Sequence, residues 1–412
     1  MRSTLPAGVR RRLLCGSLAL GLLTAVCLFP QTSRARAYVR RLPVHVHVRP
    51  APLRGDALRA LVSYEAMQRA FYVPGAGLYR GEHTYSYLWP FSQALAATVS
   101  LAYIPHEARR LRGDLSARLA GLHDYLGPAA TSSASERTGE GSGEREAGAE
   151  AKPPAPPLES FASVVAPPLG GGGTSYYDDN EWVGIELLRL YELDHDPAAL
   201  ERAKQVMAFV MAGWKTVNSK GAPVPCAGGV PFASSGGGNE TRNTVTDGPA
   251  AELGARLFRV THEIQYLQFA QMAYGWVRSC LLEPGGLYAD HIEEDGEVEP
   301  MIWSYNQGSM IGAGALLYQA TGDAAYLYEA RRTAAVALSY FPLEKLAAEN
   351  PFFVAVFLRG LLYLDWITHD PPGPRLAQSY VDYAWENIRT SEGLFLTGSP
   401  PTSEVLGQAA VV

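Results

Sequence analysis

One helical pattern ends and the next begins in the stretch Leu190-Tyr191-Glu192-Leu193-Asp194-His195-Asp196-Pro197. Aspartate is favoured as the residue that caps a helix N-terminus, and proline is favoured at the first helical position after it. The stretch therefore predicts two helices joined by a short turn. The same pattern recurs at offsets of 67 residues (190 to 257) and 60 residues (257 to 317). The residues that align are Leu190, Leu257 and Leu317, then Asp196, Glu263 and Asp323, then Leu200, Leu267 and Leu327.

Helical hairpins of this kind account for most of the chain. The two offsets are too irregular for a solenoid of identical units, but they are typical of hairpins joined by loops of variable length. Apolar residues at helical spacing predict further helices on both sides of the repeats. Eleven or twelve helices, alternating between inner and outer positions in six hairpins, predict an all-α (α/α)6 toroid. We expect helices at about 56–72, 87–103, 107–125, 179–193, 197–214, 248–260, 263–281, 307–320, 323–340, 351–368 and 375–390, and a partial closing helix at 403–412.

A segment of low complexity interrupts the helical pattern at about residues 128–157. It contains Ser, Gly, Glu, Ala and Pro with almost no aliphatic side chains, and it ends in Pro153-Pro154-Ala155-Pro156-Pro157. Such a segment buries too little apolar surface to offset the entropy of ordering it, so we expect a disordered insertion. The helices after it continue the pattern before it, which predicts one domain over residues 55–412. Residues 38–54 are basic and proline-rich, as is typical of a linker.

The first 37 residues have the pattern of an export signal. The basic triplet Arg10-Arg11-Arg12 precedes an apolar run at residues 13–29, and Ala35-Arg36-Ala37 matches a cleavage site. We therefore expect a secreted or cell-envelope protein whose mature chain begins near Tyr38. An uncleaved membrane anchor is the alternative, because an apolar run of about 17 residues is at the lower edge of what spans a bilayer.

The composition excludes several classes of partner. A formal net charge of −6 offers no basic surface to a phosphate backbone, so we exclude nucleic acid. The histidines are scattered, and His45-Val46-His47 has no third ligand at a recognised spacing, so we expect no metal and no cofactor. We expect a monomer. Cys226 and Cys280 follow the export signal; an exported pair can form one disulfide, and free buried thiols are the alternative.

Catalytic chemistry is predicted at Tyr176-Tyr177-Asp178-Asp179-Asn180-Glu181-Trp182, where a glycine run ends and a helix begins. A helix N-terminus attracts carboxylates, so capping alone accounts for one acid. It does not account for two adjacent acids flanked by aromatic rings, which are the side chains that stack on sugars. Retaining glycoside hydrolases use two carboxyl groups about 5–5.5 Å apart, one of them with a raised pKa. Adjacent residues can hold that separation, so we interpret Asp178 and Asp179 as a catalytic pair of a retaining enzyme.

Two other polar segments occupy the same position relative to their helices. Each lies about twelve residues before one of the aligned leucines at 190, 257 and 317. If the helices that follow form the inner ring, all three segments lie at one end of the central cavity. We expect that end to bind the substrate, with Trp89 contributed by the first hairpin. The segments are Asp178-Asp179-Asn180, Asn243-Thr244-Val245-Thr246-Asp247 and Tyr305-Asn306-Gln307.

Three motifs follow one another among the hairpins: Tyr177-Asp178-Asp179-Asn180-Glu181-Trp182, Arg242-Asn243-Thr244-Val245-Thr246-Asp247-Gly248 and Ser304-Tyr305-Asn306-Gln307-Gly308. Together they resemble glycoside hydrolase family 76, the endo-α-1,6-mannanases, from about residue 56 to the C-terminus. The resemblance implies an (α/α)6 barrel, retention of configuration and α-1,6-mannan as substrate. It also implies that Asp178 is the nucleophile and Asp179 the acid/base. The residues expected to bind substrate are Tyr177, Trp182, Asn243, Thr244, Asp247, Tyr305, Asn306, Gln307 and Trp89.

One stretch departs from the family's pattern. Where the family commonly has a glycine pair followed by a tryptophan-rich stretch, this chain has Gly228-Gly229-Val230-Pro231-Phe232, with one aromatic ring. That weakens the expected platform for sugar stacking. Two alternatives to a hydrolase therefore stay open: a catalytically inactive toroid that binds mannan, and a transglycosylase in which a sugar intercepts the glycosyl-enzyme. The presence of both aspartates favours catalysis over binding.

Overall fold

The computed structural model describes residues 53–127, 159–218, 220–234, 240–369, 372–398 and 401–412. These residues belong to one unit, Ala51–Val412, and a second unit, Met1–Pro50, lies wholly outside the described residues. The predicted leader at 1–37, nearly all of the predicted linker at 38–54 and the predicted insertion at about 128–157 also lie outside them.

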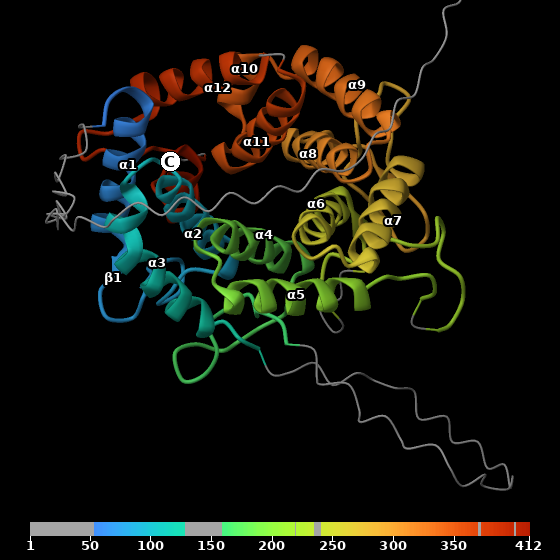
Figure 1. The fold of residues 1–412 in the computed structure, drawn as a ribbon, viewed down its shortest axis with the longest axis horizontal. Coiled ribbons are helices and arrows are strands. Elements are labelled where there is room, and N and C mark those ends of the chain that lie inside the picture. Colours follow the sequence, from blue (N-terminus) through green and yellow to red (C-terminus); the bar gives the residue numbers. More distant parts are fainter. Residues whose placement is uncertain (1–52, 128–158, 219, 235–239, 370–371, 399–400) are drawn as a thin grey trace, which may run out of the picture. The chain divides into compact units, whose positions relative to one another are not determined.

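Within the described residues, six helices form a closed inner ring. Each packs against the next around the ring, from α2 to α4, α6, α8, α11 and α13, and α13 packs back against α2. The last helix therefore closes the ring, as the sequence predicts for residues 403–412. The view of Figure 1 shows most of this ring surrounded by a second layer of helices. The inner helices are α2 (Leu88–Ala102), α4 (Tyr177–Asp194), α6 (Thr244–Thr261), α8 (Ser304–Thr321), α11 (Pro351–Thr368) and α13 (Val405–Val411).

Six outer helices each cover one inner helix, so the (α/α)6 toroid is confirmed. Five of them pack on the inner helix that precedes them in the chain, and α1 packs on α13. The outer helices are α1 (Gly55–Phe71), α3 (Glu107–His123), α5 (Pro197–Ala212), α7 (Ile264–Cys280), α9 (Ala324–Tyr340) and α12 (Pro372–Tyr383).

A few short elements were not expected. A six-residue helix, α10 (Leu343–Ala348), precedes α11, and a π-helical turn, η1 (Ala384–Ile388), follows α12. Strands β1 (Tyr72–Val73) and β2 (Leu78–Tyr79) form one antiparallel pair, and β3 (Arg242–Asn243), β4 (His291–Ile292) and β5 (Val298–Glu299) form an antiparallel sheet in the order β3-β4-β5. Strands of two residues are too short to show an alternating pattern in the sequence.

The repeated turn between inner and outer helices has a common geometry. The residues His195, His262 and Gly322 take up the left-handed conformation directly after α4, α6 and α8, and each donates its N–H to the carbonyl four residues earlier. The next residue begins the outer helix: the carboxylates of Asp196 and Asp323 each accept an N–H two residues on, at 2.9 Å. A left-handed C-terminal cap followed at once by an acidic N-cap is therefore the physical basis of the repeat.

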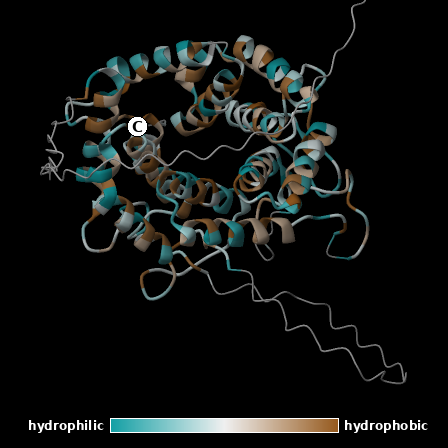
Figure 2. Cartoon of the chain, in the orientation of Figure 1, coloured by the Kyte–Doolittle hydropathy of each residue, from teal (hydrophilic) through white to brown (hydrophobic). Residues whose placement is uncertain are grey.

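The inner helices are buried on almost every side. In α8 every residue from Ser304 to Leu317 is buried, whereas the outer helices alternate between hydrophobic and hydrophilic faces (Figure 2). Glycine lets α8 and α11 approach closely, because a Cβ on Gly360 would lie 2.0 Å from the Gly308 carbonyl oxygen. Of the described helices, α11 is long and apolar enough to cross a membrane, and half of it is buried in the ring, which accounts for its composition.

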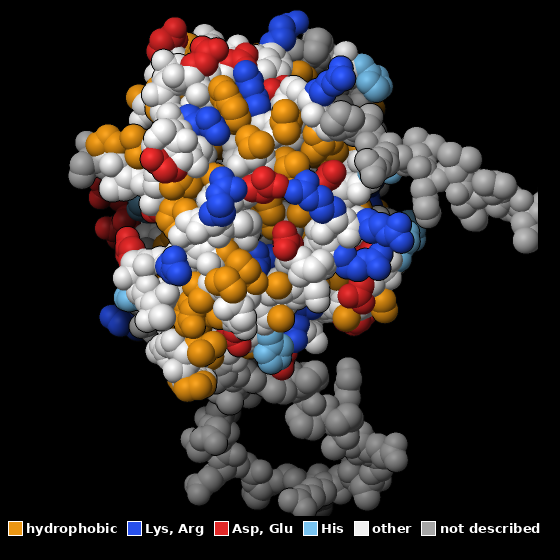
Figure 3. All heavy atoms as spheres, turned by 90° about the vertical axis from the view of Figure 1, so that its left-hand side faces the viewer, with side chains coloured by type: hydrophobic (Ala, Val, Ile, Leu, Met, Phe, Trp, Pro, Cys, Tyr) orange, Lys and Arg blue, Asp and Glu red, His pale blue; other side chains and the backbone are white. Residues whose placement is uncertain are grey.

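The outer surface carries charges of both signs. On the face that contains α1, basic and acidic side chains are interspersed with hydrophobic ones (Figure 3). Arg59 of α1 pairs there with Asp56 one turn earlier and with Asp382 of α12. Such solvent-exposed pairs contribute little to stability, so the ring is stabilised mainly by its apolar interior.

Candidate active site

The two adjacent acids lie in the first turn of α4. Asp178 is half-buried and Asp179 is 8% exposed. The N–H of Asp179 donates to Oδ1 of Asp178 at 2.9 Å, so the free amides of the helix N-terminus are directed at Asp178. No described lysine, arginine or histidine forms an ion pair with either carboxyl group. Neither acid is therefore neutralised by a structural salt bridge.

Burial separates the proton affinities of the two acids. It raises the pKa of Asp178 to about 7, against the opposing effect of backbone N–H groups that donate to its carboxylate. Burial raises the pKa of Asp179 well above its usual range, and the neighbouring charge of Asp178 raises it further. Asp178 is consequently the first of the two to ionise, and Asp179 keeps its proton beside it. One carboxylate and one carboxylic acid are the groups that a double displacement requires.

The N-terminal ends of α4, α6 and α8 meet at the same rim of the ring, as the repeat predicts. Trp182 donates its indole N–H to the Tyr305 hydroxyl at 2.6 Å, and the two rings are perpendicular with centroids 5.9 Å apart. The Tyr305 hydroxyl in turn lies 3.5 Å from the Val245 carbonyl oxygen. The expected convergence of the three polar segments is confirmed.

An aromatic belt crosses this rim from α2 to α4. Trp89 packs edge-on against Phe352, with ring centroids 5.0 Å apart, and Phe353 packs against both Trp303 and Tyr305 at 5.3 and 5.6 Å. Tyr305 then contacts Trp182, which lies one turn after Asp178. The belt is made of Trp89, Phe352, Phe353, Trp303, Tyr305 and Trp182.

Three members of the belt, Trp303, Phe352 and Phe353, were missed by the sequence analysis. The signal for two of them was present, because Leu364 precedes His369 by five residues as Leu190 precedes His195. His369 also has the left-handed conformation of the repeated turn. Twelve residues before Leu364 lies Phe352, so extending the repeat by one hairpin places Phe352 and Phe353 at the same rim as Asp178 and Asp179.

Four inner helices carry a polar side chain at their fourth residue that holds the backbone of a preceding loop. We call Asn180, Asp247, Gln307 and Gln408 the loop clamps. Asn180 accepts the N–H of Phe161 at 2.8 Å and donates to the carbonyl of the same residue at 2.9 Å. Gln307 makes the same pair of bonds to Tyr288, and Gln408 makes it to Phe395. Asp247 accepts the Val230 N–H with both oxygens, at 3.0 and 3.3 Å.

Several residues expected to bind substrate are thus occupied with the protein's own backbone and core. Gln307 and Asp247 are fully buried loop clamps. The Thr244 hydroxyl donates to the Ala289 carbonyl at 2.7 Å, and the amide of Asn306 donates to the carboxylate of Asp290 at 3.3 Å. The Tyr177 ring stacks on Phe209 of α5, with centroids 4.5 Å apart, and so packs against the outer layer. All five lie at or next to the starts of α4, α6 and α8, and their side chains bond to or pack against the protein itself.

Asp247 differs from the other loop clamps because its ionised form cannot donate to the loop carbonyl. Replacing Asp247 by asparagine supplies that donor and removes a buried acid, so we expect the variant to be more stable by about 1–2 kcal/mol. Burial raises the pKa of Asp247 well above its usual range. Its ionisation therefore opposes folding above the ordinary aspartate pKa, and the gain should be larger at pH 7 than at pH 4. Urea unfolding at the two pH values measures this, and a loss of stability at pH 7 contradicts it.

The arrangement can be compared with known proteins. Residues 166–353, which include all three motifs and the belt residues on α8 and α11, match Glycosyl hydrolase family 76. The mannan endo-1,6-alpha-mannosidase DCW1 of Candida glabrata is 27% identical over 164 residues, which is 38% of this chain and 36% of that protein. The chain therefore spans about a third of the length of the curated relatives it matches. The chain belongs to glycosyl hydrolase family 76.

Solved structures of family 76 share the fold. The family 76 mannosidase Bt3792 from Bacteroides thetaiotaomicron VPI-5482 has a TM-score of 0.71 and 18% identity, over 86% of this chain and 96% of that chain. A complex of the α-1,6-mannanase GH76A of Salegentibacter sp. HEL1_6 with α-1,6-mannotriose has a TM-score of 0.64 and 20% identity, over 87% and 97% of the two chains. That complex holds an inactive variant in which two consecutive aspartates are replaced by asparagine.

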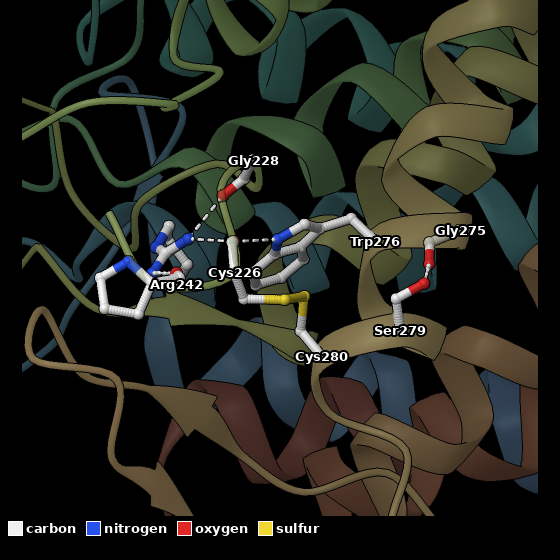
Figure 4. The surroundings of a disulfide bond; sticks show 8 residues. Cys226, Gly228, Arg242, Gly275, Trp276, Ser279 and Cys280 are labelled. Carbon is white, nitrogen blue, oxygen red and sulfur yellow. Dashed lines mark hydrogen bonds between the residues drawn. A yellow bond between two sulfur atoms is a disulfide. The ribbon is translucent and has the colours of Figure 1, made fainter. Parts of the chain in front are cut away.

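In this family 76 chain a disulfide fixes the loop that Asp247 holds. Cys226 is bonded to Cys280 at the end of α7, which decides between the two states that the sequence left open. Figure 4 shows the Cys226 carbonyl accepting hydrogen bonds from the Arg242 guanidinium at 2.7 Å and from the Trp276 indole at 2.9 Å. Arg242 also donates to the carbonyl of Gly228 at 2.8 Å. The loop that carries Val230 is therefore attached to both β3 and α7.

A buried ionic network lies under the family 76 acid pair, inside the ring. Asp178, Trp182 and Glu186 follow one another at intervals of four residues and so share one face of α4. The Arg359 guanidinium of α11 lies 4.5 Å from the centroid of the Trp182 ring and bonds to Glu186 at 3.1 Å and to Glu252 at 3.4 Å.

Within the described residues, no group of three or more His, Cys, Asp or Glu side chains is arranged to hold a metal ion.

The same rim is hollowed on both sides of α13. A cavity of about 470 Å³ lies where α2 and α13 begin, and its lining includes Arg80, Tyr87 and Glu404. A second cavity, of about 560 Å³, lies where α11 begins and includes Asn350 and Tyr380. Both cavities lie near the starts of inner helices, and neither is lined by Asp178, Asp179 or a residue of the aromatic belt.

Proposed function

We propose that the chain is a retaining glycoside hydrolase that cleaves α-1,6-mannosidic linkages in mannan-type polysaccharides or glycolipids. The observation that carries this proposal is the pair Asp178 and Asp179 at the rim of the ring, unpaired by cations and with separated proton affinities. Its substrate class is supported by the relatives named mannan endo-1,6-alpha-mannosidase and by the solved complex with α-1,6-mannotriose. Two consecutive aspartates are also the residues replaced in the inactive variant of that complex.

The proposed reaction has two steps. In the first, the Asp178 carboxylate attacks the anomeric carbon while Asp179 donates its proton to the departing glycosidic oxygen, which gives a glycosyl ester and a shortened chain. In the second, Asp179, now a carboxylate, accepts a proton from water, and the oxygen of that water displaces Asp178 from the anomeric carbon. Two inversions at one carbon retain the anomeric configuration.

We further propose that the partly exposed belt residues Trp89, Trp303, Phe352 and Phe353 supply the stacking surface that Gly228-Gly229-Val230-Pro231-Phe232 does not. The predicted binding residues Trp182 and Tyr305 are 1% and 2% exposed and support the belt from behind. Asn243 lies on β3, directly before α6. The side chains of Tyr177, Thr244, Asp247, Asn306 and Gln307 hold the loops and core behind the site. Residues 55–412 form the catalytic domain with the insertion at about 128–157, and residues 1–37 direct export to the cell envelope or beyond.

The decisive experiment is incubation of the purified protein with linear α-1,6-mannan, followed by separation of the soluble products. Release of α-1,6-mannooligosaccharides whose new ends have the α configuration in an early NMR spectrum supports the proposal. Transfer of mannosyl units to an added oligosaccharide, without release, identifies a transglycosylase. Binding without either product identifies an inactive mannan-binding toroid. An α-1,2-linked mannan is the matched control, and equal cleavage of it contradicts the assigned linkage.

The acid limb of the pH profile should lie at an unusually high pH. Asp178 must be ionised to attack, and burial raises its pKa to about 7. The value of kcat/KM should therefore fall about tenfold per pH unit below about pH 7, because kcat/KM follows the ionisations of the free enzyme. Initial rates at low substrate concentration between pH 4 and pH 9 measure this limb. A limb near pH 4, the ordinary value for aspartate, contradicts the burial of the nucleophile.

A further inference from the structure

Glu181 is a third acid beside the proposed catalytic pair, and the proposed mechanism does not use it. It is fully buried, at 0% exposure, and neither carboxyl oxygen has a hydrogen-bond partner among the described residues. It lies three residues after Asp178, so the two side chains are neighbours on the surface of α4. An ionised carboxylate without a partner is costly to bury, so Glu181 is held as a neutral acid.

The groups around Glu181 reinforce that state. The charges of Asp178, Asp247 and Asp179 act on it together with burial, and all raise its pKa. Burial and the charge of Asp178 likewise raise the pKa of Asp179. Once Asp178 is ionised, the same charge therefore holds a proton on both neighbouring acids. The other titratable groups near the cluster are Tyr177 on α4, Tyr305 on α8 and Arg242 on β3, whose charge acts on Asp247.

We propose that Glu181 is a positioning residue that keeps Asp179, the acid/base, protonated to higher pH. Once Asp178 is ionised, the next proton can leave either Glu181 or Asp179. If Glu181 ionises first, its negative charge opposes ionisation of Asp179, and the active form with a protonated Asp179 persists. Glu181 does not touch the substrate, because its oxygens are enclosed by the protein. This role rests on the proposed function, whereas the protonation of Glu181 itself does not.

The first test is the pH profile of kcat/KM on α-1,6-mannan for Glu181→Gln, which keeps the shape of the side chain and cannot ionise. We expect the alkaline limb to move to lower pH and the acid limb to stay in place, because Glu181 is neutral while Asp178 titrates. A downward shift of both limbs means that Glu181 is already ionised, which overturns the proposal. An unchanged profile means that Glu181 only fills space, which overturns it too.

The second test measures the proton on Glu181 without any substrate. The folded-state pKa of Glu181 is raised above its unfolded value of about 4.3, so the folded protein binds one more proton than the unfolded chain above that pH. Stability therefore falls as pH rises, by about tenfold per pH unit in the folding equilibrium constant for each such group. Between pH 5 and pH 6.5, the folding equilibrium constant of Glu181→Gln should therefore fall less steeply with pH than that of the unmodified protein, by about tenfold per pH unit.

A matched control and a second variant complete the design. The exposed Glu65 pairs with Arg110 on the outer surface, so Glu65→Gln should leave the slope unchanged. Glu181→Met, which removes both oxygens, should show the same slope as Glu181→Gln even if its stability is lower. Equal slopes for the unmodified protein and both Glu181 variants overturn the proposal. Inactivity on α-1,6-mannan with the expected slopes would instead refute only the proposed function.

Discussion

Replacing Asp178 by asparagine is expected to lower kcat/KM on α-1,6-mannan by about 10⁴-fold or more, because the amide cannot form the glycosyl ester. The Asn side chain keeps the volume of the acid and still accepts the Asp179 N–H, which now donates to Asp178 Oδ1 at 2.9 Å. Removal of a buried acid whose pKa is raised should also make the variant more stable at pH 8 than the unmodified protein. Lost activity with gained stability separates a catalytic role from a structural one.

Asp179→Asn should differ from Asp178→Asn in its dependence on the leaving group. Loss of a general acid costs about 10²–10⁴-fold, and this cost should shrink with an aryl mannoside whose leaving group needs little protonation. Asp178→Asn should remain inactive on both substrates. Asp194→Asn, at the exposed far end of the same helix, is the matched control and should retain full activity. If both catalytic-pair variants respond to the leaving group alike, the assigned roles are wrong.

The ring of helices was predictable because neighbouring residues determine where each helix ends and the next begins. A left-handed residue followed by an acidic cap ends one helix and starts the next, and both signals lie within a few residues of chain. The convergence of the three polar segments followed from the repeat, since equivalent positions on inner helices lie at the same rim. The hydrogen bonds made by the loop clamps could not be predicted, because their partners lie 13 to 19 residues earlier on loops without a regular pattern.

The aromatic belt shows a different limit of sequence reasoning. Trp89 was placed at the rim from the first hairpin, but its contact with Phe352 joins residues that are far apart in the chain. The spacing of apolar residues alone does not distinguish a phenylalanine at the rim from one in the core, and only the repeat, extended to Leu364, gives the positions of Phe352 and Phe353. The pairing of Cys226 with Cys280 is a similar case, because composition shows only that two cysteines are present and the fold decides whether they meet.

The ionic network under the acid pair leads to the largest expected effect on stability. Glu252 of α6 is 3% exposed and bonds to Arg256, 5% exposed, at 3.0 Å and to Arg359 at 3.4 Å. Arg359 has a second carboxylate in Glu186, but Glu252 is the only ion-pair partner of Arg256 among the described residues. Replacing Glu252 by glutamine therefore leaves Arg256 as a buried cation without an ion-pair partner among the described residues.

We expect Glu252→Gln to lower the free energy of unfolding by about 3–5 kcal/mol, the usual cost of removing one partner of a buried ion pair. Urea unfolding followed by circular dichroism measures the loss. The matched control is Glu65→Gln, whose pair with Arg110 is 41% and 48% exposed and should contribute about 1 kcal/mol or less. The double variant Glu252→Leu, Arg256→Leu removes both charges, so it should lose less stability than Glu252→Gln, since an apolar pair can replace a buried ion pair at little cost. If the double variant loses more stability than Glu252→Gln, the ion pair itself stabilises the ring. The loss in the single variant then does not come from an uncompensated arginine charge.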